Sequence, residues 1–221
     1  MSVARRTLFF DIDGTLLVAR GAGRGAFARS FEEVYGLQID MSHINFAGAT
    51  DLGVLNDLLA AHQLANVEAE KRLFFERLAV HLESAFKERP PTLFPGVMQF
   101  LERVAVHWNM ALVTGNTRAS SMLKLQYSGI DHFFDMTGGY GDDDACRNQM
   151  AALAIERAGF PERGYLLGDT PRDIEAAKVN RLIAVGVCTG AFSRDQLAQE
   201  KPDVLVDSLG DAEHLLEELC A

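Results

Sequence analysis

The stretch Phe9-Phe10-Asp11-Ile12-Asp13-Gly14-Thr15-Leu16 decides the predicted fold. Apolar residues 8–10 predict a buried strand, which ends in two aspartates and a glycine. Ligands of open parallel sheets bind just beyond the carboxyl ends of the strands, so acids there are placed for chemistry. A regular strand would send Asp11 and Asp13 to opposite faces, whereas a turn at Gly14 lets both address one point. The pattern alone also fits a plain Asp-Gly turn, so the choice depends on the rest of the chain.

Length and composition describe an ordinary globular protein. The 221 residues suit one large domain, or a core domain with a smaller insertion, and 48% of them are hydrophobic and 24% charged. A net charge of −10 argues against binding to nucleic acid or to an anionic membrane, because both require clustered cations. A small anionic substrate remains compatible with this charge if a metal ion or a few placed Lys and Arg side chains receive it.

The cysteines and the apolar runs predict a cytoplasmic protein. Cys146, Cys188 and Cys220 have neither metal-ligand spacing nor a disulfide pattern, which fits a reducing compartment. The apolar run that follows Arg6 is cut at Asp11, too early for a signal peptide, and no stretch approaches the roughly 18 apolar residues of a transmembrane helix.

A block of helices without a convincing strand follows the first strand. A glycine-rich connection over residues 20–25 leads to a helix that stops near Gly36, and Thr50 or Asp51 could cap a second helix. A third helix is expected over residues 67–87, before Pro90. Because such a block is too long for a loop, we expect residues 19–89 to form a separate helical domain inserted into a core of residues 1–18 and 90–221.

Beyond Pro95 the pattern alternates between helix and strand. Strands are predicted at residues 110–113, 133–136, 165–167, 182–187 and 204–206, with helices at 96–108, 119–127, 145–158, 174–178, 194–200 and 212–219. This order predicts an α/β fold with a doubly wound, mainly parallel, Rossmann-like sheet and helices on both faces.

Polar clusters follow several of these predicted strands. Residues 111–113 run into Thr114-Gly115-Asn116, and residues 165–167 run into Gly168-Asp169-Thr170-Pro171-Arg172-Asp173. Between them a glycine- and aspartate-rich loop leads to Arg147 at the start of a helix. Each cluster alone fits turn and cap chemistry, but a parallel sheet brings all of them to one crevice.

The residue types in this crevice point to phosphoryl transfer. Asp11, Asp13 and Asp169 form an oxygen-rich set that favours Mg²⁺ over softer-liganded metals. Thr114, a helix N-terminus and Arg147 are suited to phosphate oxygens. A carboxylate nucleophile, a second carboxylate as acid and base, and surrounding cations are what the reaction needs.

The four clusters resemble the motifs of the haloacid dehalogenase superfamily. The matching residues are Asp11-Ile12-Asp13-Gly14-Thr15, Thr114-Gly115-Asn116, Arg147 and Gly168-Asp169-x-x-x-Asp173. Within the superfamily the chain looks like a phosphoglycolate-phosphatase-like hydrolase, and the helical insertion is similar to that family's helical cap domain. The resemblance therefore spans nearly the whole chain.

The resemblance implies a role for each of these residues. Asp11 would be the nucleophile that becomes an aspartyl-phosphate, and it would also bind Mg²⁺. Asp13 would serve as general acid and base and lend its backbone carbonyl to the metal. Asp169 would ligate the metal through its carboxylate, and Asp173 would ligate it directly or hold its water.

The phosphate-binding set follows from the same resemblance. Thr114 and the backbone N–H groups of Gly115 and Asn116 would hold the phosphoryl group. The third motif usually supplies a lysine, and lysine is absent between Lys124 and Lys178, so Arg147 is the best-placed substitute. Candidate substrate contacts from the cap are Arg20, Arg24, Thr50 and Asp51. The first two also fit a solvated helix start, and the last two a helix N-cap.

These observations predict a Mg²⁺-dependent phosphatase acting on a small phosphorylated metabolite. Asp13 favours a phosphatase over a dehalogenase, because an alkoxide leaving group needs a general acid and a halide does not. A phosphomutase or phosphotransferase of the same fold and a non-catalytic phosphate-binding protein remain alternatives. A response-regulator receiver is shorter and lacks the helical insertion.

Overall fold

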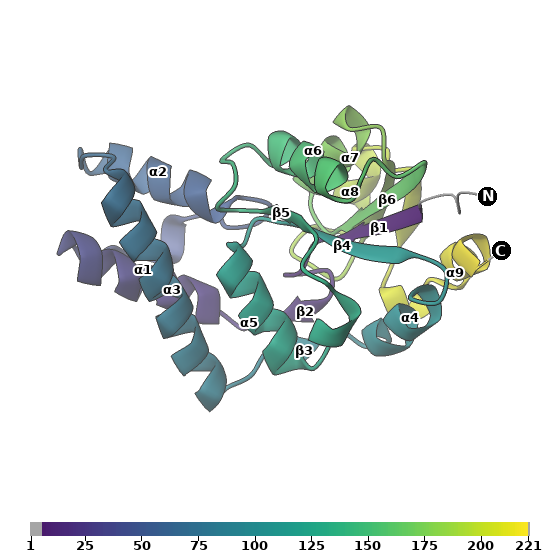
Figure 1. The fold of residues 1–221 in the computed structure, drawn as a ribbon, viewed down its shortest axis with the longest axis horizontal. Coiled ribbons are helices and arrows are strands. Elements are labelled where there is room, and N and C mark those ends of the chain that lie inside the picture. The colour runs from purple at the N-terminus through teal and green to yellow at the C-terminus, as the bar shows by residue number, and fades with distance from the viewer. Residues whose placement is uncertain (1–5, 221) are drawn as a thin grey trace.

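The computed structural model describes residues 6–220, which contain one parallel sheet, a two-stranded sheet and a block of helices (Figure 1). The strands are β1 Arg6–Phe10, β2 Leu17–Val18, β3 Thr92–Leu93, β4 Asn109–Thr114, β5 Gly138–Tyr140, β6 Arg163–Gly168, β7 Ile183–Val187 and β8 Val204–Val206. The α-helices are α1 Ala22–Tyr35, α2 Asp51–Ala61, α3 Glu68–Glu88, α4 Val97–Val104, α5 Arg118–Ser128, α6 Arg147–Arg157, α7 Pro171–Val179, α8 Arg194–Gln199 and α9 Glu213–Cys220. Short 3₁₀ helices are η1 Met41–His43, η2 Asp131–Phe133 and η3 Leu209–Asp211.

The main sheet has six parallel strands in the order β5-β4-β1-β6-β7-β8. Strand β1 is central, and its last residue, Phe10, pairs with Leu112 of β4 on one side and Leu167 of β6 on the other. The carboxyl ends of these three neighbours therefore lie side by side, as the position of a ligand crevice requires. The predicted α/β fold with a parallel sheet is confirmed.

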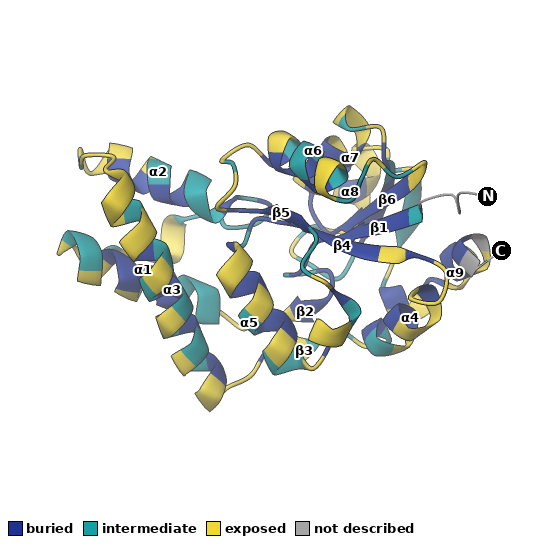
Figure 2. Cartoon of the chain, in the orientation of Figure 1, coloured by how far each residue is buried: buried dark blue, intermediate teal, exposed yellow. Residues whose placement is uncertain are grey.

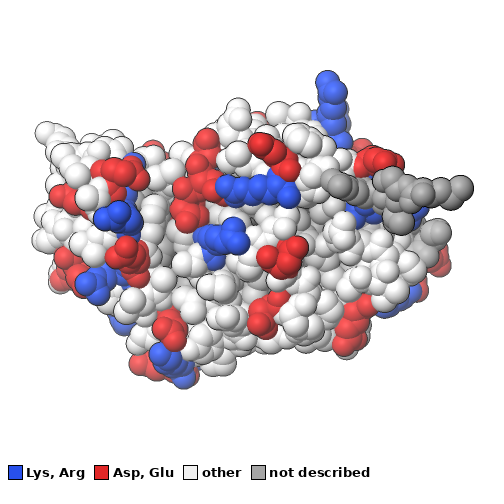
Figure 3. All heavy atoms as spheres, viewed as in Figure 1, with Lys and Arg blue, Asp and Glu red and all other residues white. Residues whose placement is uncertain are grey.

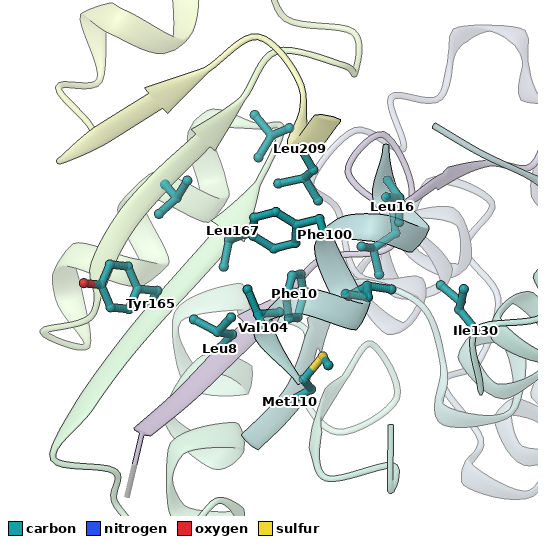
Figure 4. Packing of buried hydrophobic residues seen from close by; sticks show 14 of the residues in the cluster. Leu8, Phe10, Leu16, Phe100, Val104, Met110, Ile130, Tyr165, Leu167 and Leu209 are labelled. Carbon is teal, nitrogen blue, oxygen red and sulfur yellow. The ribbon is translucent and has the colours of Figure 1, made fainter. Parts of the chain in front are cut away.

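Two apolar layers cover the faces of this sheet. Because side chains alternate along β1, Leu8 and Phe10 enter the layer beneath α4, α5 and α9, and Phe9 enters the layer beneath α6, α7 and α8. Phe10 meets Phe100 of α4 edge to face at 6.4 Å between ring centroids, within the packing that Figure 4 shows. Burial of each large side chain stabilises the fold by about 1.5–3 kcal/mol, so β1 is fixed firmly.

Helices α1, α2 and α3 lie between β2 and β3 in the sequence. They share an apolar cluster of their own, at the left of Figure 1. Phe27 of α1 and Phe74 of α3 are central to it, with ring centroids 4.7 Å apart. Helix α5 of the core packs against α3, where Phe86 and Tyr127 lie 5.7 Å apart. Helices α3 and α5 therefore form a contact between the helical block and the rest of the chain.

Three local predictions are corrected. Residues 17–18 and 92–93, which carry no strand in the predicted pattern, pair antiparallel as β2 and β3. The pair escapes prediction because it is too short for a period-two pattern and its partners are distant in sequence. The glycine-rich connection is mostly helix, since α1 already begins at Ala22 and places Arg24 in its first turn. The helix predicted over residues 96–108 ends at Val104.

The strand predicted over residues 133–136 is also wrong. Residues 131–133 form η2, and the strand β5 comes later, at Gly138–Tyr140. Phe134 lies outside the sheet, and its apolar side chain packs on Phe10 at 5.9 Å between ring centroids. Glycine suits the true strand, since a Cβ at Gly138 would stand 2.5 Å from the carbonyl oxygen of Leu112.

The surface has mixed charge. Strands β1, β4, β5, β6 and β7 are mostly buried, while the outer sides of the helices are exposed (Figure 2). On the face drawn in Figure 3 cationic and anionic side chains are interspersed, without a broad basic area. No helix within residues 6–220 combines the length and the apolar character needed to cross a membrane.

Candidate active site

Asp11 and Asp13 occupy different environments beyond the end of β1. Asp11 is buried, and its backbone N–H donates to the carbonyl of Leu167 at 2.9 Å, which continues the β6 ladder. The Asp13 side chain is 41% exposed. Gly14, directly after Asp13, turns the chain with a φ of 84°. A Cβ at this position would stand 2.3 Å from Asp169 Oδ2. Only glycine therefore suits both the turn and the approach of Asp169.

Three carboxylates gather under this turn. Oxygen atoms of Asp11, Asp169 and Asp173 lie within 4.8 Å of one another, and all three residues are buried. Burial raises the pKa of Asp169 to about 8, with further contributions from Asp11 and Asp173. Burial also raises the pKa of Asp11 to about 6, against the opposing effect of Arg147. The cluster thus concentrates more negative charge than the protein itself neutralises.

Arg147 is the cation that the chain supplies to this cluster. Its Nη2 lies 3.1 Å from Asp11 Oδ1 and 2.5 Å from Asp173 Oδ1, and donates to the carbonyl of Val113 at 3.3 Å. Although burial lowers its pKa, the carboxylates of Asp173 and Asp11 raise the pKa of Arg147 above its ordinary value. Asp173 is fixed in turn by Thr170, whose hydroxyl donates to Asp173 Oδ2 at 2.7 Å in a capping box that begins α7. The predicted third-motif residue therefore contacts the predicted nucleophile.

The loop after β4 carries the second motif. Thr114 is fully buried, and its hydroxyl oxygen accepts from Asn116 Nδ2 at 2.8 Å. The same Nδ2 donates to Asp13 Oδ2 at 2.7 Å, so the Asn116 side chain links the two loops. This bridge was not predicted, since the sequence suggested a role for the Asn116 backbone alone.

Lys124 is a site residue that was not predicted from the sequence. It is 4% exposed, forms an ion pair with Asp13, and donates to Asn116 Oδ1 at 2.5 Å. It reaches the site from α5, one turn beyond the buried Ser120. A lysine on the inward face of a helix, in register with a small polar residue, is the sequence signal that could have identified it.

The four candidate cap residues lie near the site in different ways. Thr50 is the N-cap of α2, accepting from the N–H of Gly53 at 3.0 Å, and its hydroxyl donates to the carbonyl of Ala145 at 3.0 Å. Asp51 accepts from the N–H of Thr117 at 2.8 Å and its own N–H donates to the carbonyl of Gly115 at 2.7 Å. Burial raises the pKa of Asp51 to about 6. These bonds join the start of α2 to the core.

Arg20 and Arg24 line the same pocket as Asp11 and Asp169. Arg20 is exposed, whereas Arg24 donates to the carbonyl of Met41 and lies 4.9 Å from the centre of the Phe46 ring. Thr50 does not line this pocket, although Asp51 does. The pocket measures about 430 Å³, and Asp11, Asp13, Arg147 and Asp169 contribute to its core side.

The donor set fits a magnesium ion. Three buried carboxylates beside one arginine leave a net negative charge that a divalent cation would neutralise. All of these donors are hard oxygen atoms, which suit Mg²⁺ and not the softer metals bound by Cys or His. Thr15 supports the arrangement, since its hydroxyl donates to Asp169 Oδ1 at 3.1 Å.

Comparison with known proteins places the chain in a family. Residues 8–187 match the model of the haloacid dehalogenase-like hydrolases. The protein therefore belongs to the haloacid dehalogenase-like hydrolase family, and the expected superfamily is confirmed.

Individual relatives agree with this assignment over more than nine-tenths of the chain. The chain is 30% identical to the probable phosphatase IndB of Dickeya dadantii, over 92% of this chain and 90% of that protein. It is 23% identical to the pyrophosphatase PpaX of Listeria monocytogenes, over 93% of each. A crystal structure of a hydrolase from Pseudomonas syringae shares the fold, with a TM-score of 0.74 at 17% identity, over 99% of this chain and 100% of that one.

Proposed function

We propose that the protein is a Mg²⁺-dependent phosphoric monoester hydrolase that acts on a small phosphorylated metabolite through an aspartyl-phosphate. The observation that carries this proposal is the position of Asp11, a buried carboxylate paired with Arg147 at the floor of a pocket of about 430 Å³. Two relatives that match more than nine-tenths of the chain, one named a probable phosphatase and the other a pyrophosphatase, support hydrolysis of a phosphate compound.

In the proposed reaction Asp11 attacks the phosphorus atom with a carboxylate oxygen. The bond between phosphorus and the leaving oxygen breaks, and Asp13 gives that oxygen its proton. Asp13 then takes a proton from water as the water oxygen attacks the phosphorus, which frees Asp11 and inorganic phosphate. Lys124 and Asn116 hold Asp13 Oδ2, and so keep this acid and base at the mouth of the site.

Binding of the phosphoryl group is assigned to Thr114, to the N–H groups of Gly115 and Asn116, and to Arg147. The carboxylates of Asp11 and Asp169, the carbonyl of Asp13, and Asp173 would hold Mg²⁺. When bound, the metal would offset the charge of the carboxylates and of the phosphate. Arg147 already pairs with Asp11 and Asp173, so it fixes the nucleophile as well as attracting the anion.

The remaining assignments concern the division into domains and the location of the protein. We assign residues 1–18 and 90–221 to the catalytic core and residues 19–89 to a cap that selects the substrate, with Arg20, Arg24, Thr50 and Asp51 as candidate contacts. The separate core of α1, α2 and α3 supports this division. The scattered cysteines favour a cytoplasmic location.

The proposal is tested by release of inorganic phosphate from an aryl phosphate with Mg²⁺. Asp11→Asn should abolish turnover while the circular dichroism spectrum stays unchanged, because the amide is isosteric but not nucleophilic. Excess chelator should abolish turnover of the wild type. Full activity of the variant, or of the chelated enzyme, would contradict the mechanism. Transfer of phosphate to a sugar hydroxyl without its release would indicate the phosphomutase alternative.

A further inference from the structure

The pocket above the candidate active site has two chemically different sides. Its core side carries Asp11, Asp13, Asp169, Arg147 and Lys124. The opposite side is built by α1, the segment before α2, α3 and the residue after β3. It presents Phe27, Phe46, Leu78, Leu82 and Phe94. A phosphoryl group bound among the core residues would therefore direct its organic part against an apolar wall.

This wall is held by packing and does not depend on a ligand. Phe27 is buried and meets Phe46 edge to face at 5.5 Å between centroids, and Phe74 behind it at 4.7 Å. Leu78 and Leu82 are buried one turn apart on α3, so both face the same side of that helix. The apolar shape is thus present before any substrate arrives.

Polar groups on the cap side of the pocket are few and mostly engaged. Among the described lining residues from 19–89, the polar side chains are Arg20, Arg24 and Asp51. Arg24 donates to the carbonyl of Met41 and its guanidinium lies against Phe46, so it extends the flat wall. Asp51 accepts from the N–H of Thr117 at 2.8 Å. Substrate hydroxyl groups placed against this side would lose hydrogen bonds to water and find few protein groups to replace them.

We infer that the substrate is a phosphate monoester whose alcohol is a compact apolar group, such as a small ring or branched alkyl chain, and not a sugar or a hydroxy acid. The inference rests on the proposed phosphatase function and names its substrate class. The pocket of about 430 Å³ is at the small end of the range of roughly 300–1,000 Å³ for ligand sites. Such a volume suits a phosphoryl group with one ring.

A matched pair of esters tests this preference. Cyclohexylmethyl phosphate and glucose 6-phosphate both link a six-membered ring to phosphate through a primary CH₂–O bond, but only the second carries ring hydroxyls. We expect kcat/KM for cyclohexylmethyl phosphate to exceed that for glucose 6-phosphate by at least roughly tenfold, because apolar contacts discriminate on this scale. Equal values, or a preference for the sugar ester, would overturn the inference while leaving the phosphatase function intact.

Two variants assign the preference to the wall. Phe46→Asn, at a half-buried lining residue, should lower kcat/KM for cyclohexylmethyl phosphate by roughly tenfold and lower that for methyl phosphate by a much smaller factor. Phe75→Asn is the control, because Phe75 is also a half-buried cap phenylalanine but lies outside this pocket. Equal losses in both variants would overturn the assignment. Phe94→Asn repeats the test from the β3 side if the first variant unfolds.

Measurement of ester binding without turnover tests this inference independently of the proposed function. Calorimetry with Asp11→Asn protein and Mg²⁺ measures affinity without turnover, and should give tighter binding and a more negative heat-capacity change for the cyclohexylmethyl ester. That result together with no phosphate release by the wild type would support the apolar site and contradict the phosphatase. Equal affinities and heat-capacity changes for the two esters would overturn the inference whatever the turnover.

Discussion

Asp169 shows at the scale of one residue how the site concentrates negative charge. It is packed against Gly14 and accepts from the Thr15 hydroxyl at 3.1 Å, but it also faces Asp11 and Asp173. Burial and these two carboxylates raise its pKa from 3.8 to about 8. A carboxyl with a higher pKa in the folded state binds more protons when folded, so stability falls as the pH rises.

This sign gives a prediction for the protein in chelator. Between about pH 4 and pH 8 the free energy of unfolding of the wild type should fall relative to that of Asp169→Asn, by up to about 1.4 kcal/mol per pH unit. The amide does not titrate, so the difference between the two proteins reports Asp169 together with its interaction with Asp11 and Asp173. Urea unfolding of both proteins across the range measures the difference.

Magnesium provides the internal control for that experiment. A bound divalent cation favours the ionised carboxylate. Saturating Mg²⁺ should therefore remove the pH-dependent decrease in the free energy of unfolding of the wild type, whereas a decrease caused by a group that does not contact the metal would persist. A wild-type to variant difference that stays constant from pH 4 to pH 8 in chelator would contradict the environment described for Asp169.

At the scale of elements, the segment that starts α2 and the loop that follows β4 are built against each other. A Cβ at Gly115 would stand 1.9 Å from the carbonyl oxygen of Ala49, so only glycine permits this approach. The N–H groups of Asp51 and Leu52 donate to the carbonyls of Gly115 and Gly141, at 2.7 and 2.9 Å. The start of α2 and the loop after β4 are thus joined by backbone contacts.

Gly115→Ala should separate these two segments. The added methyl group has backbone on its far side, so we expect overpacking of about 1–3 kcal/mol and faster hydrogen exchange at the amides of Asp51, Leu52 and Thr117. Turnover should decrease together with the protection of these amides against hydrogen exchange. Gly25→Ala is the matched control, because no heavy atom lies within 4 Å of a Cβ there and the site is in helix α1.

The control should behave in the opposite way. Alanine in a helix interior is favoured over glycine by roughly 0.5–1 kcal/mol, so Gly25→Ala should stabilise the protein and keep its activity. Unchanged exchange at Asp51 and Leu52 in Gly115→Ala would show that the contact is not as close as described.

At the scale of the whole molecule, the sequence was informative where a pattern is local and repeated. The strand that ends at Phe10 and the strand Val204–Val206 were recognised from apolar runs, and the parallel order followed from their alternation with helices. The β2–β3 pair and β5 were not recognised, since two-residue strands and a Gly-Gly-Tyr strand carry no periodic signal.

The site was predictable to the extent that it lies at strand ends. Asp11, Thr114, Arg147 and Asp169 were expected in one crevice. Asp11, Arg147 and Asp169 line one pocket, whereas Thr114 is fully buried beside it and does not line it. Lys124 was not expected, because its contact with Asp13 depends on how α5 packs and spans 111 positions of sequence. The helix pattern that places Lys124 on the same face as Ser120 marks it as inward-facing, but that pattern does not identify Asp13 as its partner.

The central claim is that Asp11 becomes phosphorylated during turnover, and chemical trapping tests it most directly. The enzyme is acid-quenched while it turns over a phosphate ester with Mg²⁺, and borohydride then reduces any acyl phosphate to an alcohol. Peptide mass spectrometry should find homoserine at position 11 only when substrate is present. Phosphate release with unmodified aspartate at position 11, or with the reduced residue at another position, would contradict the account.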